Sequence, residues 1–160
     1  CLVGSEMCIR DRILKEEQKD LFTVPKNYTL VQCVSADFAM GAGIAREFAK
    51  RGVKRELKEG IISFNYTERE RIGQCVATKA TGWRVELNLI TKQKYWQKPT
   101  YETLKMTLEE LKSCCVRNDI FYIAMPKIGC GLDKLEWSKV KAIIEEVFAG
   151  TDIEILICYL

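Results

Sequence analysis

The chain has 160 residues, of which 48% are hydrophobic and 29% charged. These values are ordinary for one folded domain, and they exclude a chain that is mainly disordered, collagen-like or of low complexity. The 25 Lys and Arg against 22 Asp and Glu leave a net charge of +3, which is too small to indicate a nucleic-acid scaffold by itself.

The sequence contains no histidine, which excludes Ser-His-Asp and Cys-His catalysis and zinc sites that use histidine. Any acid–base or nucleophilic chemistry must therefore use carboxylates, Lys, Tyr, Ser or Cys. The eight cysteines include no Cys-x-x-Cys pair, so we expect free thiols and a reducing compartment, the cytoplasm or the nucleus. No apolar run approaches the roughly 18 residues that a membrane span needs, so no membrane partner is expected.

Residues 1–12 have neither helix nor strand periodicity, and they lack the basic start and the apolar stretch of a signal peptide. The string resembles a translated sequencing-adapter remnant, and a disordered terminus is the alternative. We therefore expect a single domain over residues 13–160.

The first half of that domain starts with a polar segment. Residues 13–22 form a poor pattern for a strand or a helix, whereas residues 29–35 are β-branched and apolar, which predicts a buried strand. A loop of small residues follows over 36–43. Ile44 and Phe48 then lie one turn apart, which predicts a helix up to residue 51.

The spacing of one helical turn recurs within residues 53–60 and predicts a second short helix, closed by its final glycine. Residues 61–72 have the character of a loop or an insertion. Two strands are expected over 74–79 and 84–91, because the glycine between them is typical of a hairpin turn.

Residues 92–98 (KQKYWQK) form a basic, aromatic loop. Apolar residues at spacings of four, three and four then predict a helix over about 100–117. A short apolar strand is expected over 120–125, a third amphipathic helix over 137–148 and a final strand over 153–159. Strands that alternate with helices indicate an α/β domain with a largely buried sheet.

Two glycine-containing loops each follow an apolar strand and lead into a helix: Met40-Gly-Ala-Gly-Ile44 and Ile128-Gly-Cys-Gly-Leu132. Glycine lets backbone N–H groups approach a phosphate closely, and the start of a helix adds positive potential. Neither loop is a full dinucleotide-binding motif, and a tight turn alone is enough to require glycine. Two such loops in one small α/β domain favour a phosphate-bearing ligand at the strand ends.

Lys92 closes an apolar strand, and Asp133 follows the second glycine loop. A lysine amine is a nucleophile only when neutral, so a solvated side chain or a phosphate contact is the better interpretation from spacing alone. Asp133 either acts as a general acid/base toward a ribose or caps the helix that starts near Glu136. Ser35 and Asp37 likewise either bind a ligand or form the turn after their strand.

Together these segments resemble a macrodomain, the three-layer α/β/α fold with a mixed central sheet that binds ADP-ribose. They are most similar to the glutamate-type mono-ADP-ribosyl-protein glycohydrolases, also described as O-acyl-ADP-ribose deacylases. The matching segments, over about residues 20–160, are Asp20-Leu-Phe22, Cys33–Ala45, Leu89-Ile-Thr-Lys92, Lys98-Pro-Thr-Tyr101, Met125–Asp133 and the helix from Trp137 to Gly150.

The resemblance implies a hydrolase that removes ADP-ribose from ester-linked acceptors without a metal or a cofactor. Lys92 would attack the anomeric carbon of the distal ribose, and Asp133 would be the acid/base that opens the ribose and resolves the covalent adduct. ADP-ribose and ADP-ribosylated proteins would be the partners of a monomer. The residues that would bind the substrate are Asp20, Leu21, Ser35, Met40, Gly41, Ala42, Gly43, Ile44, Ala45, Thr91, Pro126, Lys127, Ile128, Gly129, Cys130, Gly131, Leu132 and Leu160.

Two features depart from the family pattern. Residues 13–19 are charged where the family has an apolar first strand, with Lys19 in place of a glycine, so this strand has either been lost or diverged. Residues 61–72 are longer than the family needs.

Three other functions stay open: an ADP-ribose reader without turnover, an ADP-ribose 1″-phosphate phosphatase, and an enzyme acting on ADP-ribosylated nucleic acid. The basic, aromatic loop is compatible with a nucleic-acid strand. The presence of both Lys92 and Asp133 favours chemistry, because a reader needs neither group.

Overall fold

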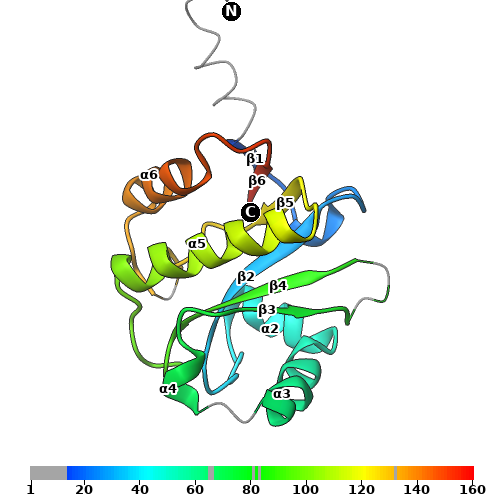
Figure 1. Cartoon of the computed structure of the whole chain (residues 1–160), viewed down its shortest axis with the longest axis vertical. Helices are drawn as coiled ribbons and strands as arrows, with labels where there is room; N and C mark the ends of the chain where they lie inside the picture. The colour runs from blue at the N-terminus through cyan, green and yellow to red at the C-terminus, as the bar shows by residue number, and fades with distance from the viewer. Residues whose placement is uncertain (1–13, 65–66, 81, 83, 132) are drawn as a thin grey trace, which may run out of the picture.

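The computed structural model of the chain describes residues 14–64, 67–80, 82, 84–131 and 133–160. Six strands form one sheet in the order β1-β6-β5-β2-β4-β3 (Figure 1). Neighbouring strands run parallel except β3 and β4, which are antiparallel. The strands are β1 (Leu14–Gln18), β2 (Thr29–Ser35), β3 (Cys75–Thr78), β4 (Glu86–Lys92), β5 (Tyr122–Met125) and β6 (Glu154–Tyr159). Residues 1–12, which we expected to stand apart from the domain, lie outside the described residues.

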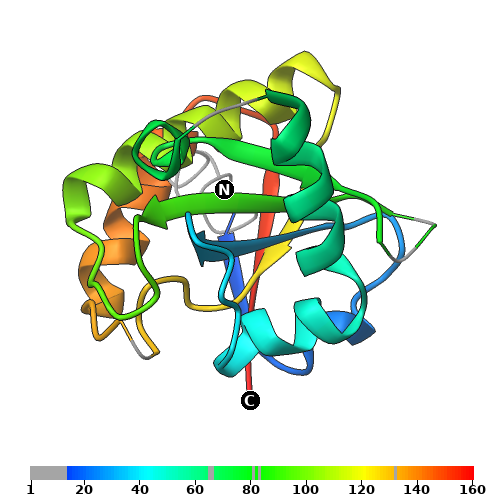
Figure 2. The same cartoon turned by 90° about the horizontal axis from the view of Figure 1, so that it is seen from below.

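Helices cover both faces of this sheet (Figure 2). Helices α5 (Tyr101–Arg117) and α6 (Trp137–Phe148) pack on one face, and α2 (Gly43–Lys50) and α3 (Val53–Phe64) pack on the other. Successive side chains of a strand point to opposite faces, so a strand between two helical layers is apolar on both sides. The predicted three-layer α/β/α architecture with a mixed sheet is therefore confirmed.

The two cores divide strand β2 between them. Val31 packs in the core under α5 and α6, whereas Leu30 and Val34 pack in the core under α2 and α3. Helix α5 buries Leu104, Leu108, Leu111 and Cys115, at the spacings that predicted it, and begins with a capping box between Thr100 and Thr103.

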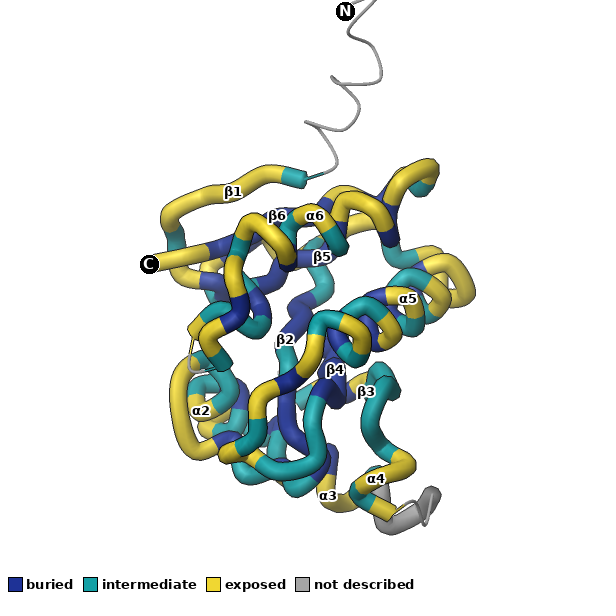
Figure 3. Tube along the Cα trace, turned by 90° about the vertical axis from the view of Figure 1, so that its left-hand side faces the viewer, coloured by how far each residue is buried: buried dark blue, intermediate teal, exposed yellow. Residues whose placement is uncertain are grey.

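Of the two alternatives for the first strand, lost or diverged, the structure shows the second. Residues Leu14–Gln18 form β1, which pairs in parallel with β6 from Leu14 opposite Ile155 to Gln18 opposite Tyr159. Most of this strand is exposed (Figure 3), since β1 lies at the edge of the sheet. Charged side chains suit an edge strand because they hinder pairing with another chain. The first strand has diverged in character and has not been lost.

The region from Gly60 to Arg71 also differs from expectation. Helix α3 continues through Gly60 to Phe64, and a short helix, α4 (Glu68–Arg71), follows after a capping box between Thr67 and Glu70. A glycine that ends a helix takes the left-handed conformation, and Gly60 is not among the residues with positive φ. Gly60 therefore continues the helix instead of closing it.

Strands β5, β2 and β4 are adjacent and parallel, so their carboxyl ends meet at one edge of the sheet. The described residues of the loops that leave these ends are 36–42, 93–100, 126–131 and 133–136. The register places Ser35, at the end of β2, opposite Lys92, at the end of β4. In open α/β sheets this edge is where ligands bind.

Candidate functional site

A cavity of about 570 Å³ lies at the carboxyl ends of β2, β4 and β5. Its walls come from the ends of β2 and β4, the two glycine loops and the first turn of α2. The lining residues are Cys33, Val34, Ser35, Ala39, Met40, Gly41, Ala42, Gly43, Ile44, Ala45, Thr91, Lys92, Tyr95, Pro126, Lys127, Ile128, Gly129, Gly131 and Asp133. A volume of this size holds a ligand as large as a nucleotide.

Lys92 and Asp133 form an ion pair on the wall of this cavity. The Nζ of Lys92 donates a hydrogen bond of 2.5 Å to Oδ1 of Asp133. The two side chains are 13% and 18% exposed, so the pair is largely shielded from water. Asp133 does not cap the helix that follows, because Glu136 is the N-cap residue of α6 and makes no side-chain capping bond. The carboxylate is therefore directed to the lysine.

The first glycine loop delivers the start of α2 to the cavity. Ala42 is the N-cap residue in extended conformation, and its methyl side chain cannot cap the free N–H groups of the first turn. Those N–H groups, with the helix dipole, form a site for an anion such as a phosphate. A Cβ atom placed on Gly41 would have no other atom within 4 Å, so the space beside this residue is open to a ligand.

The loop before α2 is held in an unusual backbone conformation. Phe38 and Met40 have positive φ values of 51° and 47°, which non-glycine residues adopt at a cost of about 1 kcal/mol or more each. Two cations from the other side of the loop stabilise it: Lys54 Nζ donates to the Ala39 carbonyl at 3.0 Å, and Arg71 donates to the Ala36 carbonyl at 2.8 Å. The loop thus keeps one shape beside the cavity.

Asp37 ties two of the loops together. Its Oδ1 accepts hydrogen bonds from Ser35 Oγ at 2.5 Å and from the Ala39 N–H at 3.1 Å, and its Oδ2 accepts from the Tyr95 N–H at 3.1 Å. Burial alone would raise the pKa of Asp37, but these three hydrogen bonds and Lys94 outweigh it and lower the pKa. The sequence left open whether Ser35 and Asp37 bind a ligand or form the turn after their strand. The structure shows that they form the turn, and Ser35 also lines the cavity.

The second glycine loop folds back on itself. The Leu135 N–H donates to the Gly129 carbonyl at 2.8 Å, and the Lys134 N–H donates to the Gly131 carbonyl at 3.2 Å. Gly129 has φ of +71°, and a Cβ there would lie 2.8 Å from Cδ1 of Leu135. Gly131 has open space around it. The close turn places Asp133 back against Lys92.

Two further side chains of the wall are polar. The Thr91 hydroxyl is buried and has no hydrogen-bond partner among the described residues. Lys127 lies with its Nζ 4.5 Å from the Tyr159 ring centroid and 4.0 Å from Oε1 of Glu16. These contacts hold a cation at the wall.

The thiol of Cys33 also lines the cavity, but burial and the charge of Asp133 raise its pKa. Burial likewise raises the pKa of the Cys130 thiol, which lies in the second glycine loop. Neither thiol is therefore set up as a thiolate nucleophile at neutral pH.

Fifteen of the residues singled out from the sequence line the cavity, and four do not. Asp20 caps the short 3₁₀ helix η1 (Leu21–Thr23) by accepting from the Phe22 N–H, and Leu21 is buried in the core under α2 and α3. Cys130 points its Sγ to the Ile128 carbonyl, and Leu160 is 94% exposed at the end of the chain. Leu132 lies outside the described residues.

The sequence interpretation missed four lining residues, namely Cys33, Val34, Ala39 and Tyr95. Cys33 and Val34 were assigned to the core because their strand is mostly apolar. Tyr95 belongs to the basic, aromatic loop, whose position beside the cavity depends on the pairing of β4 with β2.

Two classes of site are not found in the part of the chain that the structure describes. There is no group of three or more His, Cys, Asp or Glu residues that could hold a metal ion. No helix within the described ranges is long and apolar enough to cross a membrane.

Known proteins resemble this chain in sequence and in structure. The sequence profile of the Macro domain family matches residues 31–144. The "ADP-ribose glycohydrolase OARD1" of Bos taurus is 44% identical over 138 residues, which is 86% of this chain and 86% of that protein.

Among solved structures, the macrodomain of Mycobacterium tuberculosis DarG superposes with a TM-score of 0.76 at 21% identity, over 92% of this chain and 97% of that one. "Thermosipho africanus DarTG in complex with ADP-ribose" superposes with a TM-score of 0.78 at 19% identity, over 93% of this chain and 42% of that one. These two likenesses show a shared fold.

Proposed function

Because the chain belongs to the Macro domain family, we propose that it is a hydrolase that releases ADP-ribose from ester-linked acceptors, either glutamate or aspartate side chains of proteins or O-acyl groups. The observation that carries this proposal is the shielded Lys92–Asp133 pair on the wall of the cavity. The relative from Bos taurus, named an ADP-ribose glycohydrolase, supports it.

The cavity suits the two ends of ADP-ribose differently. The first turn of α2 and the loop around Gly129 and Gly131 offer backbone N–H groups and open space for the diphosphate. The distal ribose would then lie next to Lys92 and Asp133.

The first half of the reaction forms a covalent adduct. Asp133 takes a proton from the Lys92 ammonium along their hydrogen bond, which leaves a neutral amine and a carboxylic acid. The amine nitrogen attacks C1″ of the distal ribose, and the acceptor leaves as a carboxylate with the electron pair of the broken C–O bond. The nitrogen then loses a proton to solvent and expels the ring oxygen, which takes the proton of Asp133, so that a protonated imine links the opened ribose to Lys92.

The second half releases the product. The Asp133 carboxylate takes a proton from a water molecule, and the hydroxide formed attacks the imine carbon. The proton passes to the lysine nitrogen as the C–N bond breaks, and the ribose closes again. The sum is ester plus water giving ADP-ribose, the free acceptor carboxylate and one proton, with Lys92 regenerated.

A direct assay tests this function. The purified chain is incubated with glutamate-linked ADP-ribosyl peptide, O-acetyl-ADP-ribose, serine-linked ADP-ribosyl peptide and DNA-linked ADP-ribose, and released ADP-ribose is measured. We expect release from the two esters and little from the serine ether. Tight binding of ADP-ribose without release from any substrate would overturn the proposal in favour of a reader.

We further propose a reducing compartment, the cytoplasm or the nucleus, as the place of action. The six cysteines among the described residues are free, which supports this assignment.

A further inference from the structure

Two aromatic side chains stand out from the surface beside the cavity. Tyr95 and Trp96 are 64% and 70% exposed. Among the large hydrophobic residues of the described ranges, only the terminal Leu160 is more exposed. They occupy the tip of a closed turn, because the Gln97 N–H donates to the Lys94 carbonyl at 3.0 Å and the Lys94 N–H donates to Oε1 of Gln97 at 2.8 Å. Exposure of both rings to water is unfavourable in free energy, and neither ring belongs to a core of the fold.

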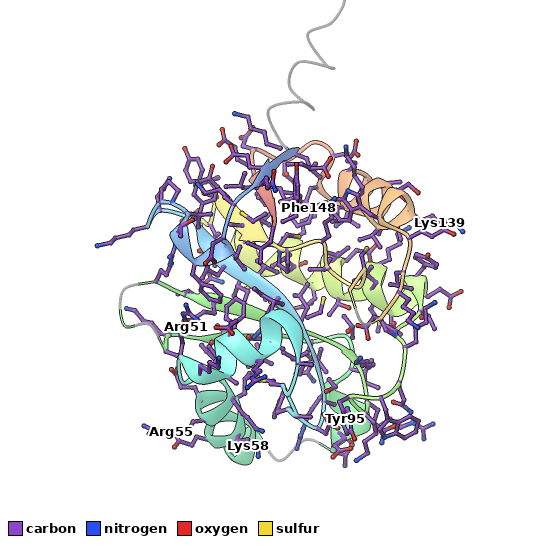
Figure 4. The ribbon with its side chains drawn as sticks, turned by 180° about the vertical axis from the view of Figure 1, so that it is seen from behind. Arg51, Arg55, Lys58, Tyr95, Lys139 and Phe148 are labelled. Atoms are coloured by element: carbon purple, nitrogen blue, oxygen red, sulfur yellow. The ribbon has the colours of Figure 1, made fainter. Side chains whose placement is uncertain are left out.

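Two contacts fix the turn to the rest of the molecule. The Tyr95 N–H donates to Asp37, and Lys94 Nζ lies 2.8 Å from Oε2 of Glu68 in α4. Figure 4 shows Tyr95 at the periphery of the molecule, on the same side as α4. The two rings are therefore presented on an ordered backbone, and little backbone entropy remains to be lost when a partner binds.

The turn also lies at the reacting end of the cavity. Tyr95 lines the cavity together with Lys92, which precedes it by three residues, and with Asp133. The atom that leaves C1″ of a bound ADP-ribose must depart from this end. Because Tyr95 lines the same cavity as Lys92 and Asp133, the turn is within reach of a group attached to that atom.

We propose that Tyr95 and Trp96 form an acceptor subsite, which binds the polypeptide around an ADP-ribosylated carboxylate side chain. This inference rests on the proposed function and names the acceptor that the site selects. Tyr and Trp bury large areas with few rotatable bonds, which is why they dominate the energy of many protein interfaces.

The charges around the turn favour a polypeptide over a nucleic-acid strand. Two of the three lysines of this loop, Lys92 and Lys94, are neutralised by Asp133 and Glu68, and among the described residues only Lys98 of the loop makes no ion pair. The carboxylate of Asp37 lies directly under the turn. Binding of a nucleic-acid backbone depends on cations free to replace counterions, and paired lysines do not supply them.

The test compares two esters that differ only in their acceptor. One is a peptide of about ten residues carrying ADP-ribose on glutamate, and the other is 1″-O-acetyl-ADP-ribose, whose acceptor is a two-carbon acyl group on the same C1″ oxygen. For Trp96→Ala we expect the ratio of kcat/KM for the peptide to kcat/KM for the acetyl ester to fall about tenfold, as for loss of an interface anchor. Trp96→Phe should restore most of the ratio. Phe121→Ala, which removes a 48% exposed aromatic at the opposite end of β5, should leave the ratio at its wild-type value.

Three results would overturn the inference. The first is a ratio within twofold of wild type in Trp96→Ala, and the second is an equal fall for both esters, which would mean that the turn only supports Lys92. The third is a loss confined to a DNA-linked substrate, which would assign the rings to a nucleobase.

If the wild-type chain hydrolyses neither ester, the proposed function fails but the subsite is still tested. Calorimetry would then compare the modified peptide with free ADP-ribose. The subsite is supported if Trp96→Ala lowers the affinity for the modified peptide about tenfold more than the affinity for ADP-ribose. It is rejected if the variant and the wild type bind the modified peptide with equal affinity.

Discussion

The Nζ of Lys92 lies 2.5 Å from Oδ1 of Asp133, although 41 positions separate the two residues in the sequence. Lys92 ends β4, and Asp133 lies in the loop after β5, with β2 between these two strands in the sheet. Both side chains are largely shielded from water, and the hydrogen bond between them is a direct path for a proton. Their contact makes the pair a single acid–base unit, and the first two predictions separate its two halves.

Lys92→Arg should bind ADP-ribose but lose nearly all hydrolysis. Arginine keeps the positive charge and stays protonated at any working pH, so it supplies no neutral amine. Release of ADP-ribose from O-acetyl-ADP-ribose measures turnover, and calorimetry measures binding. Near-normal turnover would refute covalent catalysis and leave Asp133 with an activated water as the mechanism.

Asp133→Ala should keep ADP-ribose affinity within about tenfold and lower turnover by roughly 10²-fold or more, the usual scale for loss of a general acid/base. Because the adduct is then not resolved, a ketoamine formed by rearrangement of the imine should accumulate. Mass spectrometry should map an added ADP-ribose to Lys92. An adduct on another residue, or wild-type turnover, contradicts the assignment.

Gly131→Glu should abolish ADP-ribose binding while the domain stays folded. No atom lies within 4 Å of a Cβ at this position, and Gly131 lines the cavity, so the new carboxylate would occupy the place of the diphosphate. Thermal unfolding with increasing ADP-ribose should raise the Tm of the wild type and leave that of the variant unchanged. Gly131→Ala is the matched control, with binding retained.

Asp37→Asn should lower the free energy of unfolding by about 1–3 kcal/mol at pH 6, since hydrogen bonds to a charged acceptor are the stronger ones. The pKa of Asp37 is lowered in the folded state, so its contribution is present above the unfolded pKa of about 3.9 and is lost as the pH falls through the folded value. Urea unfolding of both proteins from pH 6 to pH 3 should show the difference shrinking below about pH 4. A difference that is constant over this range would show that ionisation of Asp37 is irrelevant.

Cys114 should be alkylated before the other described cysteines at pH 7. A hydrogen bond with Cys75 lowers its pKa, although burial raises it, and Arg117 and Asn118 lower it further. Burial raises the pKa of Cys33, Cys115 and Cys158. Labelling with iodoacetamide and peptide mapping from pH 5 to 9 should give Cys114 a midpoint below the usual value of about 8.5. Cys75→Ala should move that midpoint upward.

Most of the fold followed from local patterns. Apolar runs and helical spacing predicted β2, the β3–β4 hairpin, α5, α6 and β6 close to their observed bounds. These patterns are reliable here because each of these elements buries an apolar face between the sheet and a helical layer. The motifs around Lys92 and Asp133 carried the resemblance to macrodomains, which the match over residues 31–144 confirms. Residues 61–72 were harder, since Gly60 is compatible with a helix end and with a helix interior.

The sequence by itself determined the chemical groups of the candidate site: a lysine at one strand end, a carboxylate after a glycine loop, and no histidine. Only the tertiary structure decided that β1 is a strand, because its backbone pairing with β6 stabilises it whatever its side chains are. It also decided that Asp37 anchors the loop of Tyr95 and that Asp133 pairs with Lys92 instead of capping α6. The physical reason is that hydrophobic periodicity encodes which residues are buried, whereas contacts between loops depend on the order and register of parallel strands that are distant in the sequence.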